Sequence, residues 1–163
     1  MGYTYVMSDI HGMGALLEEM LEKIHFSGED VLYILGDMID RGFEPAKVLD
    51  IVRGTENITA LTGNHEDGFV DWFENVPDKV RQRYYYNTYD VLMDSQETRD
   101  KIPEYVQFMK GLPLYKKLKQ DGKCYLMAHA STEEILRVWK RRERLIWDSS
   151  MVDRKAGIPG YVS

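Results

Sequence analysis

The chain has 163 residues with 27 acidic and 21 basic side chains, which gives a formal net charge of -6. This acidic balance argues against a general affinity for nucleic acid, because nucleic-acid phosphates attract basic surfaces. The length and the 44% hydrophobic content suit a single globular domain over 1–163. The one cysteine, Cys124, cannot form an internal disulfide, and no membrane span or signal sequence is evident, so we expect a cytoplasmic protein.

The front of the chain alternates between strand-like and helix-like patterns. Strands are predicted at 3–7, 31–35 and 58–62, and amphipathic helices at 13–24 and 45–53. The order β-α-β-α-β is typical of an α/β fold with a parallel sheet, because parallel neighbours need a crossover connection.

The middle of the chain, from about 66 to 111, is polar, aromatic and helical in pattern. We interpret it as a helical insertion over the sheet and not as a second domain. The tyrosines at 84–89 favour a packed helix face over the lining of a substrate groove. Further on, Asp121-Gly122 predicts a hairpin between 114–118 and 123–128, and a capping-box pattern predicts a helix over 132–142.

Three polar motifs follow the three predicted strands. They read Asp9-Ile10-His11-Gly12, then Gly36-Asp37-Met38-Ile39-Asp40-Arg41-Gly42, then Gly63-Asn64-His65-Glu66. Because ligands of open α/β sheets gather at the carboxyl ends of the strands, we expect these motifs to converge. Their Asp, His and Asn side chains are suited to divalent metals, and Asp37 could bridge two ions through its two oxygens. Two ions about 3.5–4 Å apart can activate a water and assist in-line displacement at phosphorus.

The three motifs resemble the signature of the calcineurin-like metallophosphoesterases. The Asp-Arg-Gly end of the second motif resembles the phosphoprotein phosphatase branch, including its bacterial and phage members. The resemblance implies a β-sandwich flanked by helices in α/β/β/α order. It also implies one metal ion on Asp9, His11 and Asp37, and a second on Asp37, Asn64 and His129.

The same resemblance implies roles in catalysis. His65 would protonate the leaving oxygen, oriented by Asp40, while Arg41 would bind the phosphate together with Asn64. Imidazole is the usual proton donor near neutral pH, and a carboxylate partner fixes its orientation. An arginine fork matches two phosphate oxygens.

The implied activity is metal-dependent hydrolysis of phosphate monoesters, with phosphoserine or phosphothreonine in proteins as the leading substrate and a water activated by two metal ions. The resemblance favours Mn²⁺, while ligand chemistry also accepts Fe, Zn²⁺ or Mg²⁺. The expected partner is a phosphorylated protein or a small phosphoester, with no nucleic acid and no membrane. A dinucleoside polyphosphate hydrolase of the same superfamily is the alternative.

The end of the chain departs from the family pattern. No histidine follows His129, whereas the family usually has a later Gly-His that completes the second metal site. Asp148 and Ser149 follow Trp147 where a second phosphate-binding arginine is usual, and Arg154 is a candidate substitute. We therefore expect missing C-terminal strands and self-association through an exposed sheet edge. A catalytically impaired, truncated metal-binding remnant is the third hypothesis.

Overall fold

The parallel sheet predicted for the front of the chain is present. The computed structural model describes residues 2–77, 84–130 and 146. Strands β1 (Thr4–Met7), β2 (Val31–Ile34) and β3 (Ile58–Ala60) are parallel and neighbour one another in that order. Helix α1 (Gly14–Lys23) connects the first two strands, and helix α2 (Pro45–Gly54) connects the second pair. The α/β class and the β-α-β-α-β order are confirmed.

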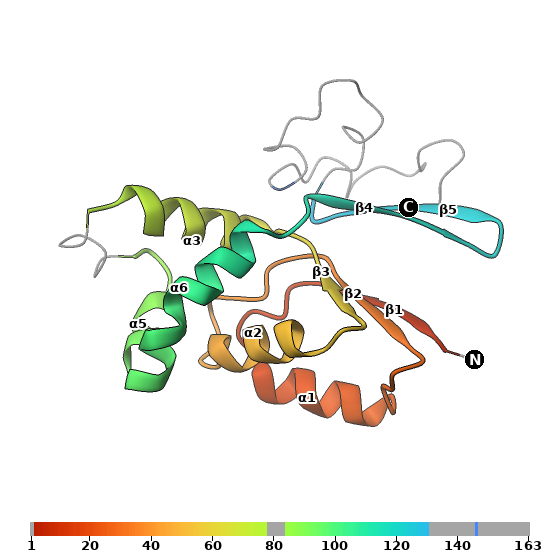
Figure 1. Cartoon of the computed structure of the whole chain (residues 1–163), viewed down its shortest axis with the longest axis horizontal. Helices are drawn as coiled ribbons and strands as arrows, with labels where there is room; N and C mark the ends of the chain where they lie inside the picture. Colours follow the sequence, from red (N-terminus) through yellow and green to blue (C-terminus); the bar gives the residue numbers. More distant parts are fainter. Residues whose placement is uncertain (1, 78–83, 131–145, 147–163) are drawn as a thin grey trace, which may run out of the picture.

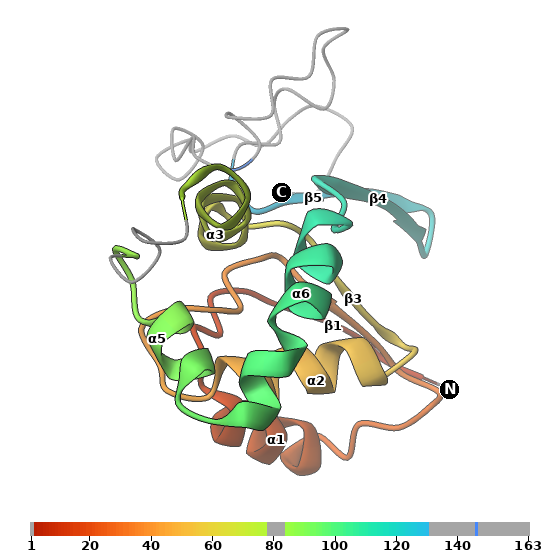
Figure 2. The same cartoon turned by 60° about the vertical axis from the view of Figure 1, so that its left-hand side comes forward.

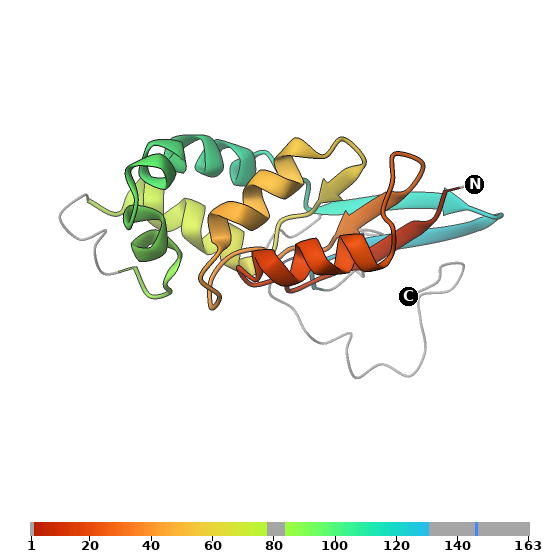
Figure 3. The same ribbon diagram turned by 90° about the horizontal axis from the view of Figure 1, so that it is seen from below.

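The two crossover helices cover one face of the parallel sheet (Figure 1). Seen from below, α1 and α2 lie in front of the strands (Figure 3). Leu17 of α1 and Val48 and Leu49 of α2 are buried in the same core cluster as Ile34 of the central strand. Pro45 opens α2 at the first helical turn, where the missing N–H of proline costs no hydrogen bond.

The predicted insertion is helical, but its first helix begins earlier than expected. Helix α3 covers Asn64–Asn75, followed by α5 (Thr88–Met93) and α6 (Gln96–Lys110). The third motif therefore does not precede the insertion, because Asn64 and His65 lie in the first turn of α3. Helix α6 contacts α2, α3 and α5, so the insertion packs against the domain (Figure 2).

A two-stranded antiparallel sheet lies on the other face of the parallel sheet (Figure 1). Its strands β4 (Tyr115–Gln120) and β5 (Lys123–Ala128) meet at the predicted Asp121-Gly122 turn. Both turn residues have positive φ, 50° and 74°, as a type I′ hairpin requires. Buried Met127 packs with Tyr33 and Leu61 between the two sheets.

The described residues thus contain a layer of helices, the parallel sheet and a hairpin layer. The predicted complete sandwich with helices on both outer faces is not present within 2–77, 84–130 and 146, and the predicted helix over 132–142 lies outside these residues. Among the described strands, none pairs with the outer edge of β1. None of the described helices combines the length and the apolar character that a membrane span needs.

Candidate functional site

The loops after the three parallel strands lie together at the carboxyl end of the sheet. The backbone N–H groups of Asp9 and His11 donate to the carbonyls of Gly36 and Asp37 at 3.1 and 2.9 Å. These hydrogen bonds join the first motif to the second. The third motif joins them through the His65 N–H, which donates to the Asp37 carboxylate at 3.1 Å.

The backbone at these loops is held in an unusual conformation. Five predicted site residues have φ between 47° and 66°, in the left-handed region: Asp9, His11, Asp37, Asp40 and Arg41. Residues other than glycine adopt the left-handed region at a cost in energy. Residues in this conformation cluster at active sites and ligand clamps. The hydrogen bonds between the loops stabilise these conformations.

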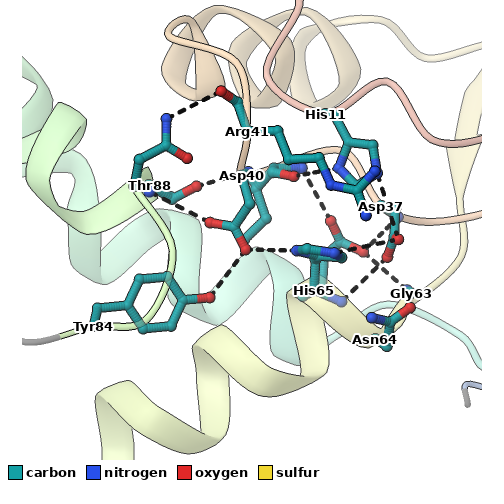
Figure 4. Close-up of polar contacts among 12 residues, drawn as sticks. His11, Asp37, Asp40, Arg41, Gly63, Asn64, His65, Tyr84 and Thr88 are labelled. Atoms are coloured by element: carbon teal, nitrogen blue, oxygen red, sulfur yellow. Dashed lines mark hydrogen bonds and ion pairs between the residues drawn. The ribbon is translucent and has the colours of Figure 1, made fainter.

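Asp37 lies at the centre of the cluster (Figure 4). Its Oδ2 is 3.8 Å from Nε2 of both His11 and His65, and its Oδ1 is 3.4 Å from Nε2 of His129. The carboxylate is buried, with a side-chain exposure of 4%. Three imidazoles around one buried carboxylate form a set of nitrogen and oxygen donors that suits a divalent metal.

Among the described residues, His11 shows most clearly that the cluster could hold a metal ion. Its Nδ1 lies 3.0 Å from the carbonyl oxygen of Ile39, which leaves Nε2 to face the cluster. This Nε2 atom is buried and has no hydrogen-bond partner. Donor atoms of His11, Asp37 and His65 all lie within 4.8 Å of one another. A metal ion would satisfy the unpaired nitrogen, and the contact with Ile39 would orient the ring as in known metal sites.

Asp9 lies at the edge of this group. Its carboxylate is 57% exposed, and Oδ1 is 3.6 Å from Nε2 of His11. An open position of this kind allows a ligand to enter from solvent.

The residues predicted for the second ion are also brought together. His129 Nε2 lies 2.9 Å from Oδ1 of Asn64, on the same side as the Asp37 Oδ1 contact. The other ring nitrogen of His129 lies 2.8 Å from the carbonyl oxygen of Leu35. The hairpin therefore delivers His129 from the opposite layer to the first turn of α3.

His65 and Asp40 form a buried pair. Nδ1 of His65 is 2.7 Å from Oδ2 of Asp40, whose side chain is fully buried. Tyr84 donates its hydroxyl to the same Oδ2 at 3.1 Å, and the N–H of Thr88 donates to Oδ1 at 3.3 Å. The Asp40 N–H in turn donates to the Thr88 hydroxyl at 2.8 Å. The insertion thus fixes the carboxylate that orients His65.

Charges around His65 control its protonation. Burial lowers the pKa of His65, but the Asp40 hydrogen bond and the charges of Asp37, Asp40 and Glu66 together raise that pKa above its ordinary value. The raised pKa favours the protonated imidazole near neutral pH, which is the form that can donate a proton. Burial and the Asp40 charge raise the pKa of Tyr84 strongly, so its hydroxyl stays a donor.

Glu66 of the third motif caps helix α3 and also supports the second motif. Its carboxylate accepts the N–H groups of Gly63, Asp37 and Met38 at 2.7–2.9 Å. It is fully buried, and burial together with the Asp37 charge raises its pKa, although the three N–H groups oppose this. Glu66 therefore joins the third motif to the backbone that carries Asp37.

Arg41 is exposed at the rim of the site. Its side chain extends from the second motif toward His11 (Figure 4). A depression of about 420 Å³ beside it is lined by Met13, Leu16, Phe43 and Glu44, among others. The position fits a group that contacts a bound phosphate from the solvent side.

The sequence did not identify Tyr84 and Thr88 as supporting residues. Tyr84 belongs to the tyrosine group for which a packed helix face was favoured, and this prediction is wrong for 84–86. These residues precede α5, and Tyr85 and Tyr86 are exposed. Within this tyrosine group, Tyr84 and Tyr89 pack on Trp72, with ring centroids 4.7 and 5.0 Å away. The run of tyrosines that begins at Tyr84 is the one sequence signal that could have connected this segment with the site.

A histidine–carboxylate cluster at the carboxyl end of a parallel α/β sheet is an arrangement expected of a metal-dependent hydrolase. The sequence profile of the calcineurin-like phosphoesterases matches residues 3–154, and the chain belongs to this family. The resemblance seen in the motifs is thereby confirmed, and with it the assignment to metallophosphoesterases.

Curated relatives include a tetraphosphatase and a protein phosphatase. The chain is 30% identical over 128 residues to a symmetrical bis(5′-nucleosyl)-tetraphosphatase of Paracidovorax citrulli, covering 77% of this chain and 43% of that protein. It is also 30% identical over 132 residues to serine/threonine-protein phosphatase 2 of Salmonella typhimurium, covering 78% of this chain and 58% of that protein. The chain therefore spans about half the length of the curated relatives it matches.

Solved structures agree on the fold. A serine/threonine phosphatase from Saccharomyces cerevisiae matches with a TM-score of 0.56 at 19% identity, covering 90% of this chain and 52% of that one. A putative diadenosine tetraphosphatase matches with a TM-score of 0.57 at 19% identity, covering 80% of this chain and 54% of that one. At these identities the likeness supports the fold alone.

Proposed function

We propose that the chain hydrolyses phosphate monoesters, with phosphoserine and phosphothreonine in proteins as the leading substrates. The observation that carries this proposal is the buried Asp37 carboxylate among three imidazoles, next to the His65–Asp40 pair. This arrangement combines a candidate metal centre with a proton donor a few ångströms away, as phosphoryl transfer to water requires.

The proposed ligands follow from the contacts in the cluster. One ion would be held by Asp9, His11 and Asp37, and a second by Asp37, Asn64 and His129. When bound, divalent ions would supply positive charge for the phosphoryl oxygens and lower the pKa of a bound water. Mn²⁺ is the proposed metal, and oxygen and imidazole donors also accept Fe, Zn²⁺ or Mg²⁺.

The side chains of this chain have distinct tasks in the proposed reaction. Arg41 and Asn64 bind phosphate oxygens and orient the ester. The bond between phosphorus and the leaving oxygen breaks, an oxygen from water replaces it, and the His65 proton passes to the leaving oxygen. Asp40 holds His65 in the orientation that points Nε2 at that oxygen.

His65 has two competing roles, because its Nε2 belongs to the group of possible metal donors. We assign it to proton transfer, since Nδ1 is held by Asp40 and the surrounding carboxylates favour the protonated ring. Replacement His65→Asn decides between the roles. A proton donor can be removed while Mn²⁺ binding is kept, whereas the loss of a ligand weakens Mn²⁺ binding as well.

The direct test is the release of phosphate from p-nitrophenyl phosphate and from a phosphoserine peptide with added Mn²⁺. Activity that disappears with a chelator and in Asp37→Asn, while the variant keeps its fold by circular dichroism, supports the proposal. Hydrolysis that is independent of metal, or unchanged in Asp37→Asn, contradicts it.

A second candidate substrate is a dinucleoside polyphosphate. Several curated relatives at 28–30% identity bear the name of a bis(5′-nucleosyl)-tetraphosphatase. Parallel assays on diadenosine tetraphosphate and on the phosphoserine peptide separate the two, because the higher kcat/KM identifies the preferred substrate. Measurable Mn²⁺ binding without turnover of either substrate would instead support the metal-binding remnant.

A further inference from the structure

Two exposed tyrosines beside the cluster have no task in the proposed reaction. Tyr86 is 38% exposed and Tyr85 is 88% exposed, directly after Tyr84 with its bond to Asp40. Large aromatic side chains that gather in solvent next to a polar site often mark a binding surface.

Tyr86 lies against the candidate proton donor. The ring centroids of Tyr86 and His65 are 4.5 Å apart with the planes tilted by 50°. Tyr85 meets Tyr86 edge to face, with centroids 4.9 Å apart and an angle of 89°. Both spacings lie in the range of favourable aromatic contacts. We refer to Tyr85 and Tyr86 as the aromatic wall.

The orientation of His65 places this wall on the side of the leaving group. Nδ1 is held by Asp40, so Nε2, which faces Asp37 at 3.8 Å, is the nitrogen that can meet a leaving oxygen. That oxygen must approach Nε2 to about 3 Å to receive a proton. Atoms attached to the leaving oxygen then lie next to the imidazole ring and within reach of Tyr86.

We propose that Tyr86, supported by Tyr85, determines specificity by contacting the leaving group and favouring an aromatic ring attached to the leaving oxygen. The site would then accept aryl esters, including tyrosyl phosphate, as well as alkyl esters. This inference rests on the proposed function, since it takes His65 as the donor to the leaving oxygen. The aromatic wall carries no positive charge, so it cannot form an ion pair with an additional phosphate group. A neutral ring, in contrast, can stack on it.

The affinities of non-hydrolysable ligands test the role of the aromatic wall without turnover. Benzylphosphonate and cyclohexylmethylphosphonate have the same charge and similar size, but only the first carries an aromatic ring. In each, a methylene replaces the leaving oxygen. With Mn²⁺ present, calorimetry should show benzylphosphonate binding about threefold to tenfold tighter, the range expected of an aromatic pair.

Substitutions assign the preference to one side chain. Tyr86→Phe keeps the ring and should keep the preference, whereas Tyr86→Leu should bring the ratio of affinities close to one. Tyr3→Leu removes another exposed tyrosine, 70% exposed and just ahead of β1, and should change nothing. If Tyr86→Leu fails to fold, the Tyr86 ring resonances of the wild type, assigned from Tyr86→Phe, should still shift when benzylphosphonate binds with diamagnetic Mg²⁺ in place of Mn²⁺.

Several results would overturn the inference. They are equal affinities for the two phosphonates, no saturable binding of benzylphosphonate, an unchanged preference in folded Tyr86→Leu, or unshifted Tyr86 resonances. Competition by non-hydrolysable analogues identifies the source of the ring: phosphonomethylphenylalanine, the analogue of phosphotyrosine, should displace benzylphosphonate more strongly than the methylphosphonate analogue of adenosine monophosphate, and the reverse order contradicts the aryl assignment. The proposed function is tested separately, by the Mn²⁺-dependent release of phosphate, so its failure can be told apart from failure of this inference.

Discussion

Asp40 connects the chemistry of the cluster to the helical insertion. Its carboxylate accepts from His65 and Tyr84 on one oxygen and from Thr88 on the other. Loss of its charge should leave the His65 ring poorly oriented and less basic, without removing a proposed metal ligand. Its effect should therefore depend on how much the leaving group needs a proton.

For Asp40→Asn we expect kcat on an alkyl phosphate to fall about 10²–10⁴-fold, the usual contribution of a positioned acid. The fall should be much smaller for p-nitrophenyl phosphate, whose leaving oxygen departs readily without a proton. Steady-state kinetics on both esters measure this difference. Equal losses on the two substrates would show that Asp40 acts only through the fold.

The individual motif residues could be predicted from the sequence, because their order and spacing are local features. The structure brings Asp37, His11, Asn64 and His129 together as expected. The contacts of Tyr84 and Thr88 with Asp40 could not be predicted from the sequence. Those contacts depend on where the insertion folds back onto the second motif, and no periodicity in the sequence encodes that path.

Among the elements, the loops after β2 and β3 cross closely at Gly36. Gly36 has φ +97°, and a Cβ there would lie 2.5 and 2.6 Å from the backbone N and Cα of Gly63. Backbone atoms cannot turn aside as a side chain can, so these two loops require a glycine.

We predict that Gly36→Ala destabilises the chain by about 2–4 kcal/mol, because overpacking and an unfavourable φ act together. Gly54→Ala is the matched control, since Gly54 ends α2 and a Cβ added there would meet no atom within 4 Å. Urea unfolding of both variants provides the comparison. Similar free energies of unfolding for the two would contradict the close crossing.

The turn before β2 depends on a carboxylate. Asp30 accepts the backbone N–H groups of Tyr3 and Ser27 at 2.7 and 2.9 Å, which joins the start of β1 to this turn. These hydrogen bonds hold the pKa of Asp30 below its ordinary value of 3.8. A lowered pKa stabilises the folded state above the unfolded pKa, and this contribution is lost as the pH falls through the folded value.

Wild type should therefore be more stable than Asp30→Asn at pH 7, and the difference should shrink below pH 3.8. Urea unfolding at several pH values measures it. A difference that stays constant down to acid pH would mean that the charge of Asp30 contributes nothing.

The strands, crossover helices and hairpin were predictable because each rests on a local pattern, such as the apolar run of β2 or Asp121-Gly122. The start of α3 at Asn64 was not predictable, because the sequence indicated that Asn64 and His65 lie in a loop. The helix begins there since Glu66 accepts the Gly63 N–H and closes the first turn.

For the whole molecule, the site draws on both sheets. His129 comes from the hairpin layer, while Asp37 and Asn64 come from the parallel layer and the insertion. The packing of Met127 on Tyr33 and Leu61 sets the distance between the layers and hence the place of His129. Self-association through an exposed sheet edge remains a prediction. Among the described strands, the outer edge of β1 has no neighbour.

Titration with Mn²⁺ by calorimetry tests most directly whether Asp37 organises a metal centre. We predict saturable binding of two ions per chain, with both sites weakened in Asp37→Asn because its carboxylate serves both. One ion per chain would indicate the metal-binding remnant. No saturable binding, or an Asp37→Asn variant that binds Mn²⁺ like the wild type, would contradict the account.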